Sequence, residues 1–257
     1  MCELLGMSAN VPTDICFSFS GLMVRGGQTA PHKDGFGVTF YEGKGSRTFK
    51  DALPSCESEI AKLIQSYPIK SVCVISHIRQ ANRGRVSLEN THPFSREMWG
   101  QNWTFAHNGQ LKGVKKLTTD HFQPVGTTDS EHAFCWLMSQ IKAKYPNKPP
   151  QDRKTLFRLV AKLAPTLHEM GVANFFLADG RYLFAHCSNN LHWLTRRAPF
   201  GVASLSDVEM TVDFQQETTP NDIVTVIATK PLTTNEDWYK MAPQEYQLFD
   251  LGEPIKL

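Results

Sequence analysis

The chain has 257 residues, 41% of them hydrophobic, and its formal net charge at pH 7 is +2. A chain of this size can bury a full core, and its near-neutral charge predicts no nucleic-acid partner and no acidic tail. No segment reaches the roughly 18 continuous apolar residues of a membrane span, so we also expect no membrane association.

The N-terminus and the cysteines predict a cytoplasmic protein. The sequence starts Met1-Cys2-Glu3 and lacks the basic region of a secretory signal. The cysteines are scattered without the spacing of metal knuckles or redox pairs, which fits a reducing compartment. Cys73, Cys135 and Cys187 lie in apolar runs, and we expect them to be buried thiols.

In chain order, the first half predicts alternating strands and helices. We expect a short apolar strand at 2–7, a helix at 13–24 with Thr13 as its cap, a strand at 35–41, a helix at 55–67 and strands at 71–78 and 103–106. Thr128 to Glu131 forms a capping box, so a helix is expected to start there and to continue through the apolar run 133–141.

The second half changes from helices to strands. Residues 145–150 are typical of a connection between helices, and a second long helix is expected at 151–170. Strands then follow at 172–177, 181–186, 191–194, 201–205 and 223–228, with turn signals such as Asp179-Gly180. Consecutive strands favour antiparallel pairing, so the sequence predicts an α+β fold with two mainly antiparallel sheets, in a single domain over 1–257.

Cys2 is the first candidate for chemistry. Removal of Met1 would leave a residue that carries both a thiol and a free α-amine. An α-amine has a pKa of about 7.7 to 8.0, so it can accept the thiol proton and replace the usual histidine base. The structural alternative is an incidental cysteine near a chain end.

Two charged residues are candidates for holding an amino-acid substrate. Arg79 follows a predicted strand, and a guanidinium there can bind a carboxylate with two hydrogen bonds. Asp129, in the capping box, is a candidate for the substrate ammonium group. A surface salt bridge would equally explain Arg79, and pure helix capping would explain Asp129.

Asn108-Gly109 follows the strand predicted at 103–106. The pair is typical of a hairpin turn, which is the simpler interpretation. It also supplies a side-chain amide and an unobstructed backbone N–H, which together can form an oxyanion hole. The glycine-containing segment 32–37 is expected to form a turn in the site wall, because it lacks the composition of a phosphate loop.

His77 and His107 lie inside these motifs, and we include both among the candidate substrate-binding residues. Neither they nor His92 has the spacing of a metal site, so we expect no metal and no other cofactor. A purely structural, hydrogen-bonded role would also explain these histidines.

Taken together, these motifs resemble the class II glutamine amidotransferase domain of the N-terminal-nucleophile hydrolases. The resemblance covers nearly the whole chain and is closest to the short, stand-alone members of that family. The matching motifs, in order, are Cys2, 32–37, 76–79, 91–94, 107–109 and 128–131.

The resemblance implies a four-layer αββα sandwich and a set of roles. Cys2 would attack the γ-amide of glutamine and form a γ-glutamyl thioester that water hydrolyses, with release of ammonia. Asn108 and Gly109 would stabilise the oxyanion, while Arg79 and Asp129 would bind the α-carboxylate and the α-ammonium of the substrate.

Several functions stay open on the sequence alone. The chain could hydrolyse glutamine and deliver ammonia to a partner protein, or it could hydrolyse a larger γ-glutamyl compound without transfer. It could also be a non-catalytic binding module on the same fold, or a metalloenzyme.

Overall fold

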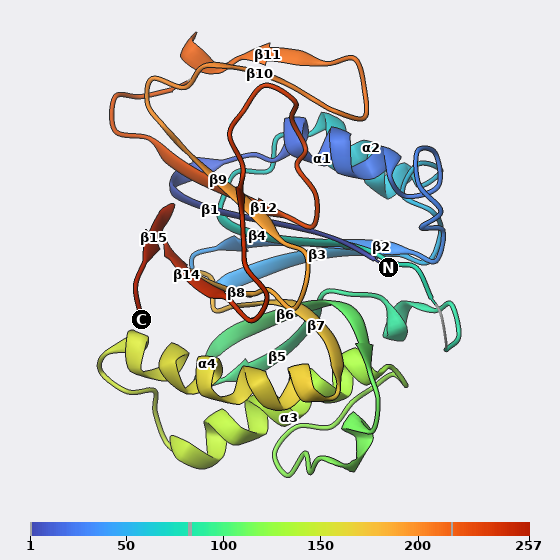
Figure 1. Ribbon diagram of the computed structural model, residues 1–257, viewed down its shortest axis with the longest axis vertical. Coiled ribbons are helices and arrows are strands. Elements are labelled where there is room, and N and C mark those ends of the chain that lie inside the picture. The colour runs from blue at the N-terminus through green and yellow to red at the C-terminus, as the bar shows by residue number, and fades with distance from the viewer. Residues whose placement is uncertain (1, 82–83, 217) are drawn as a thin grey trace.

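The fold is built on two stacked sheets, with helices on their outer faces (Figure 1). The computed structural model describes residues 2–81, 84–216 and 218–257. In these residues the strand pairs of both large sheets are antiparallel. The predicted α+β class and the four-layer αββα arrangement are therefore confirmed.

The first sheet contains the N-terminal strand near its centre. Its strands, in spatial order, are β13 (Tyr239–Lys240), β9 (His192–Arg197), β12 (Ile223–Ala228), β1 (Glu3–Thr13), β4 (Ser71–Ile78), β2 (Phe36–Glu42) and β3 (Gly45–Asp51). Glu3 pairs with Ile78, so the start of β1 lies beside the end of β4.

The second sheet is formed largely by the C-terminal half of the chain. Its strands, in spatial order, are β15 (Glu253–Ile255), β14 (Tyr246–Asp250), β8 (Tyr182–His186), β7 (Gly171–Ala178), β6 (Gln101–Leu111) and β5 (Phe94–Met98). A separate short ribbon pairs β10 (Val202–Ser204) with β11 (Thr211–Asp213).

The outer layers are helical. The first sheet is covered by α1 (Cys16–Val24) and α2 (Glu59–Ser66), and the second by α3 (Asp129–Lys144) and α4 (Arg153–Glu169). The Thr128 hydroxyl accepts a hydrogen bond from the Glu131 N–H, which confirms the predicted cap. Among the described residues, no helix is long and apolar enough to cross a membrane.

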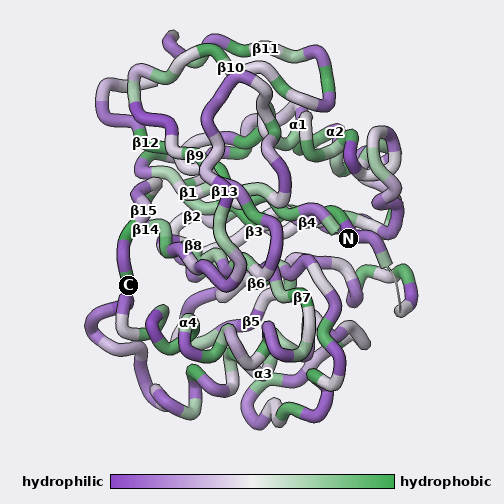
Figure 2. The backbone as a smooth tube through the Cα atoms, viewed as in Figure 1, coloured by the Kyte–Doolittle hydropathy of each residue, from purple (hydrophilic) through white to green (hydrophobic). Residues whose placement is uncertain are grey.

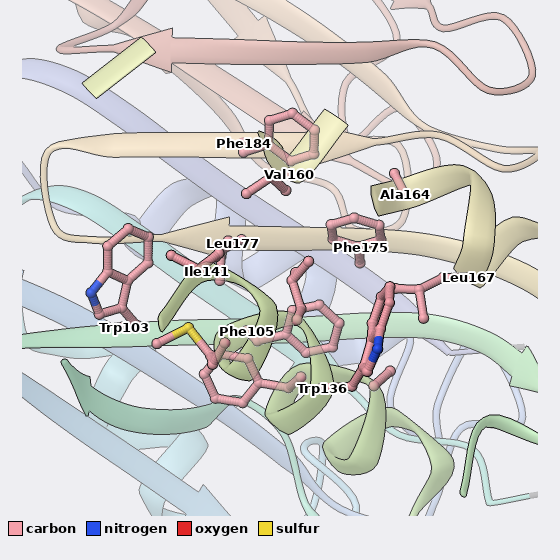
Figure 3. Packing of buried hydrophobic residues seen from close by; sticks show 14 of the residues in the cluster. Trp103, Phe105, Trp136, Ile141, Val160, Ala164, Leu167, Phe175, Leu177 and Phe184 are labelled. Carbon is pink, nitrogen blue, oxygen red and sulfur yellow. The ribbon is translucent and has the colours of Figure 1, made fainter. Parts of the chain in front are cut away.

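Three apolar clusters in the described residues fill the spaces between the four layers. One lies between the sheets and includes Leu4 and Phe176. Another packs the second sheet against α3 and α4, around Trp103, Phe105 and Phe175 (Figure 3). Figure 2 shows α3 and α4 alternating between hydrophobic and hydrophilic stretches, as expected for helices with one buried face.

Strands β4 and β12 have the bounds that the sequence predicts, whereas several predicted boundaries are wrong. Thr13 does not cap a helix, because it is the last residue of β1 and pairs with Ser71. Strand β1 extends well beyond residue 7, and α2 begins at Glu59 with Ser58 as its cap.

The predicted hairpin turn at Asn108-Gly109 is also wrong. Both residues lie inside β6, where Asn108 pairs with Asn174 and Gly109 with Ala173 of β7. The turn chemistry of this dipeptide is overridden by the tertiary pairing of a long strand. Strands β3, β5, β11, β13, β14 and β15 are short or rich in polar residues, and no sequence pattern predicted them.

The two sheets are joined by a buried hydroxyl. Tyr41 of β2 places its Oη 2.7 Å from Thr104 Oγ1 and 3.1 Å from the carbonyl oxygens of Asn102 and Ala178, which belong to the second sheet. Tyr41 is 1% exposed, and burial raises the pKa of its phenol. The group therefore stays a neutral hydrogen-bonding link between the layers.

We predict that Tyr41→Phe lowers the free energy of unfolding by about 1–2 kcal/mol, because it leaves buried polar groups without a partner. Urea unfolding measures this change. Tyr246→Phe is the matched control, since Tyr246 is 42% exposed and its loss of a hydroxyl should change stability by less than about 0.5 kcal/mol. Equal stability of both variants would contradict this role of Tyr41.

Candidate active site

A cavity of about 640 Å³ opens where β1, β4, β6 and α3 present their ends. Of the residues predicted for the site, Cys2, Arg79, His107, Gly109 and Asp129 line this cavity. Asn108 and His77 are buried beside it and do not line it. The fold thus brings most of the candidate residues together from segments far apart in the sequence.

Cys2 is half-buried, immediately before β1. Its Sγ accepts a hydrogen bond from the Gln80 N–H at 3.3 Å and lies 3.5 Å from the Gln80 carbonyl oxygen. Burial raises the pKa of the thiol, while the Gln80 hydrogen bond and the Arg79 charge act in the opposite direction. The resting group is therefore a thiol, which requires a base before it can attack.

The start of β1 is fixed by a buried ion pair. Glu3 is 2% exposed and lies 3.3 Å from the Arg25 guanidinium, which also contacts Asp207 at 2.6 Å. The same guanidinium donates to the Pro231 carbonyl. These contacts hold the backbone next to Cys2 in place, and the sequence analysis missed them because the partners are distant in sequence.

Arg79 is a buried cation that has no ion pair with another described residue. It follows β4, is 3% exposed, and its side chain donates to the Asp34 carbonyl at 3.3 Å. Across residues 2–81, 84–216 and 218–257, no carboxylate lies within 4.0 Å of it. A buried charge is costly unless it is paired, so this guanidinium is suited to an external carboxylate.

The segment 32–37 lies behind Arg79, and its residues do not line the cavity, so its predicted place in the site wall is wrong. Gly35 has φ +106° and accepts a hydrogen bond from the Arg79 N–H at 2.8 Å. The Asp34 carboxylate accepts from the Ala81 N–H at 2.7 Å. The segment therefore braces the chain on both sides of Gln80.

Asn108 and Gly109 are neighbours in β6 with different surroundings. Gly109 lines the cavity, and Asn108 points toward Thr229, with 3.5 Å between Nδ2 and Oγ1. The Oδ1 atom of Asn108 has no hydrogen-bond partner in the described residues. The Leu4 N–H donates to the same Thr229 hydroxyl at 2.9 Å, so Asn108 lies close to the first residues of β1.

A buried asparagine in β7 fixes this part of β6. Asn174 is fully buried, and its amide donates to the Asn108 carbonyl at 3.1 Å. Its Oδ1 accepts from the backbone N–H groups of three consecutive residues, 188–190. Nothing in the sequence distinguishes Asn174 from a turn residue, because its role depends on the register between β6 and β7.

Asp129 is the first residue of α3, and its carboxylate is anchored by the backbone. It accepts hydrogen bonds from the Leu111 N–H at 2.7 Å and from the Ser130 N–H at 2.9 Å. Negative charge is stabilised at a helix N-terminus. The contacts fix a carboxylate in the wall of the cavity that Arg79 also lines.

The histidines near the cavity are neutral and buried. His107 donates from Nε2 to the Val172 carbonyl and accepts from Ser130 Oγ at Nδ1, and burial lowers its pKa. The rings of His77 and His92 lie against each other in a tilted arrangement with 4.1 Å between their centroids, and burial lowers the pKa of both. The described residues contain no group of three or more His, Cys, Asp or Glu side chains that could hold a metal ion.

The chain is similar to known proteins along nearly its whole length. The family model described as class II glutamine amidotransferases matches residues 1–257. The chain is 64% identical to YafJ of Escherichia coli (strain K12), whose name designates it provisionally as a glutamine amidotransferase, over 99% of this chain and 100% of that protein. A similarly named protein of Haemophilus influenzae is 47% identical, and the match covers 99% of this chain and 86% of that protein.

Solved structures share the fold. A predicted glutamine amidotransferase from Pseudomonas aeruginosa PA01 superposes with a TM-score of 0.80 at 49% identity, over 100% of both chains. The glutamine phosphoribosylpyrophosphate amidotransferase of B. subtilis superposes with a TM-score of 0.60 over 97% of this chain and 47% of that one. At 15% identity the latter shows the fold alone.

We predict that Gly109→Ala destabilises the protein by about 3 kcal/mol, because a Cβ there would overlap the Val172 carbonyl oxygen of the paired strand. Urea unfolding measures the effect. Gly201→Ala is the control, since a Cβ at Gly201 meets nothing within 4 Å. The free energy of unfolding of this variant should differ from that of the wild type by less than about 0.5 kcal/mol. A stable Gly109→Ala protein would show that β6 and β7 can separate here.

Proposed function

Because this chain belongs to the class II glutamine amidotransferases, we propose that it hydrolyses the γ-amide of glutamine or of a related γ-glutamyl compound, with Cys2 as the nucleophile. One observation carries this proposal: the Cys2 thiol, the Arg79 guanidinium and the Asp129 carboxylate line the same cavity. A cation and an anion in the cavity wall suit the zwitterionic end of an amino-acid substrate. A nucleophile in the same cavity can then reach an amide at the opposite end of that substrate.

The base in this proposal is the α-amine of Cys2 after removal of Met1, a residue outside the described part of the chain. The contacts of Sγ in the described residues support it, because its hydrogen-bond partner is the backbone of Gln80 and not a histidine. His107 has both ring nitrogens engaged elsewhere. An α-amine titrates near neutral pH and can take the thiol proton.

The reaction then proceeds in two steps. The Cys2 thiol attacks the γ-carbonyl carbon while its proton passes to the α-amine, and the C–N bond breaks as that proton moves to the leaving ammonia. Water next attacks the γ-glutamyl thioester, which releases glutamate and restores the thiol. The atoms balance without a cofactor.

The oxyanion of each step needs fixed donors. We assign these to the Gly109 N–H and the Asn108 side-chain amide. The 3.5 Å contact between Asn108 Nδ2 and Thr229 Oγ1 is at the limit of a hydrogen bond, so the amide can turn to a better acceptor at small cost. An ammonia-accepting partner protein stays a prediction from the family resemblance.

The nucleophile is tested by intact mass before and after treatment with a diazo-ketone analogue of glutamine. We expect a mass that lacks Met1 and a single adduct on Cys2, with loss of glutamine hydrolysis. Cys2→Ala should take no adduct and lose at least about 1,000-fold in kcat. Cys56→Ala, which removes another half-buried thiol, is the control and should label normally. Labelling of a protein that retains Met1 would contradict the α-amine mechanism.

The carboxylate partner is tested by Arg79→Ala. We expect KM for glutamine to rise by about 100-fold with a smaller change in kcat, because a ground-state contact to the α-carboxylate is lost. Arg47→Ala is the control, since Arg47 is an exposed cation whose partner, Glu42, also lies on the β2–β3 hairpin. An unchanged KM with a collapsed kcat would show that Arg79 acts on the reacting amide.

A further inference from the structure

The cavity extends well beyond the residues assigned to glutamine. Its volume of about 640 Å³ is in the range of roughly 300–1,000 Å³ found for pockets that bury drug-sized ligands. The groups proposed for glutamine occupy the part around Cys2, Arg79 and Asp129. The segment 112–116 and Gly84 line much of the remainder.

This outer part carries unmatched positive charge. Lys112, Lys115 and Lys116 all line the cavity. None of their ammonium groups has an ion pair or a side-chain hydrogen bond within the described residues. The described lining therefore holds four cationic side chains, counting Arg79, and one carboxylate, Asp129.

The lysine-bearing segment is held in a fixed conformation. The Lys112 N–H donates to the Met170 carbonyl at 2.8 Å, and Val114 is 1% exposed and anchors the short helix η2 (Val114–Lys116) in the core. His132 of α3 donates to the Leu117 carbonyl at 2.8 Å. The backbone that carries the three lysines is therefore fixed, and only their side chains have to be ordered when a ligand binds.

We propose that the preferred substrate is a γ-glutamyl amide whose amine part carries an anionic group. The inference rests on the proposed function: if Arg79 and Asp129 hold the zwitterionic end, the three lysines remain for a charge beyond the scissile amide. Cys2 takes the glutamyl group, the C–N bond breaks, and the anionic amine leaves with the transferred proton. Water then releases glutamate from the thioester.

The charge preference is tested with γ-glutamylglycine and γ-glutamylglycinamide, which differ by one carboxylate. We expect kcat/KM for the acid to exceed that for the amide by about tenfold at low ionic strength, and the ratio to fall as salt is added. In a variant with Lys112→Gln, Lys115→Gln and Lys116→Gln the ratio should approach one. A wild-type ratio of one or less would overturn the proposal.

Lys44→Gln is the matched control. Lys44 is also an exposed, unpaired lysine among the described residues, but it lies in the turn between β2 and β3, at the opposite end of the hairpin from Asp34. Its ratio should equal that of the wild type. A fall as large as in the lysine variant would assign the preference to net charge and overturn the proposed subsite.

A binding experiment separates this inference from the proposed function. Calorimetry on Cys2→Ala measures the Kd of both peptides without turnover, and tighter binding of the acid supports the charged subsite even if neither peptide is hydrolysed. Absence of the diazo-ketone adduct on wild-type Cys2 would instead defeat the proposed function. The Kd of γ-glutamyl aminomethylphosphonate is measured in the same way and compared with that of γ-glutamylglycine. The lower of the two Kd values shows whether the subsite prefers a phosphate-type anion or a carboxylate.

Discussion

The antiparallel pairing of β1 with β4 is the constraint on which the site depends. Glu3 is opposite Ile78, which brings Cys2, one residue before this pair, to the backbone of Gln80, two residues after it. A shift of one residue in this register would turn the side chains of β1 to the other face and remove Leu4 from the core between the sheets. The apolar packing that fixes the register therefore also fixes the position of Cys2, the proposed nucleophile.

The sequence was sufficient for the fold class, and it singled out several residues that the fold brings to one cavity. A cysteine at position 2, an arginine after a strand and an aspartate at a helix start could be proposed because the chemistry of each lies in its side chain. The same local signals misled at Asn108-Gly109, where a turn dipeptide lies inside a strand. Pairing with β7 outweighs local propensity, and that pairing is not visible in a window of a few residues.

The parts of the site that the sequence did not reveal act through the backbone or through distant partners. Gln80 contacts Cys2 with its main chain, and a backbone contact of this kind cannot be recognised from the residue type. Asn174 and Arg25 are ordinary polar residues in the sequence, and only the tertiary structure places them beside Asn108 and Glu3. Short polar strands such as β3 and β15 likewise become strands only because an edge of a sheet is available.

The charge around the cavity depends on buried histidines that stay neutral as well as on the charged Arg79. His77 and His92 lie next to Arg79. Burial is the largest cause that lowers the pKa of both, and the neighbouring His107 and Arg79 act in the same direction. Both rings are therefore neutral at pH 7 and do not repel the guanidinium. Since the unfolded histidines titrate near pH 6.5, the unfolded chain binds more protons below that pH, and stability falls as the solution is acidified. Burial thus sets the protonation of the two rings. Among the described residues no carboxylate lies within 4.0 Å of Arg79, so its guanidinium is available to an anion from outside the chain.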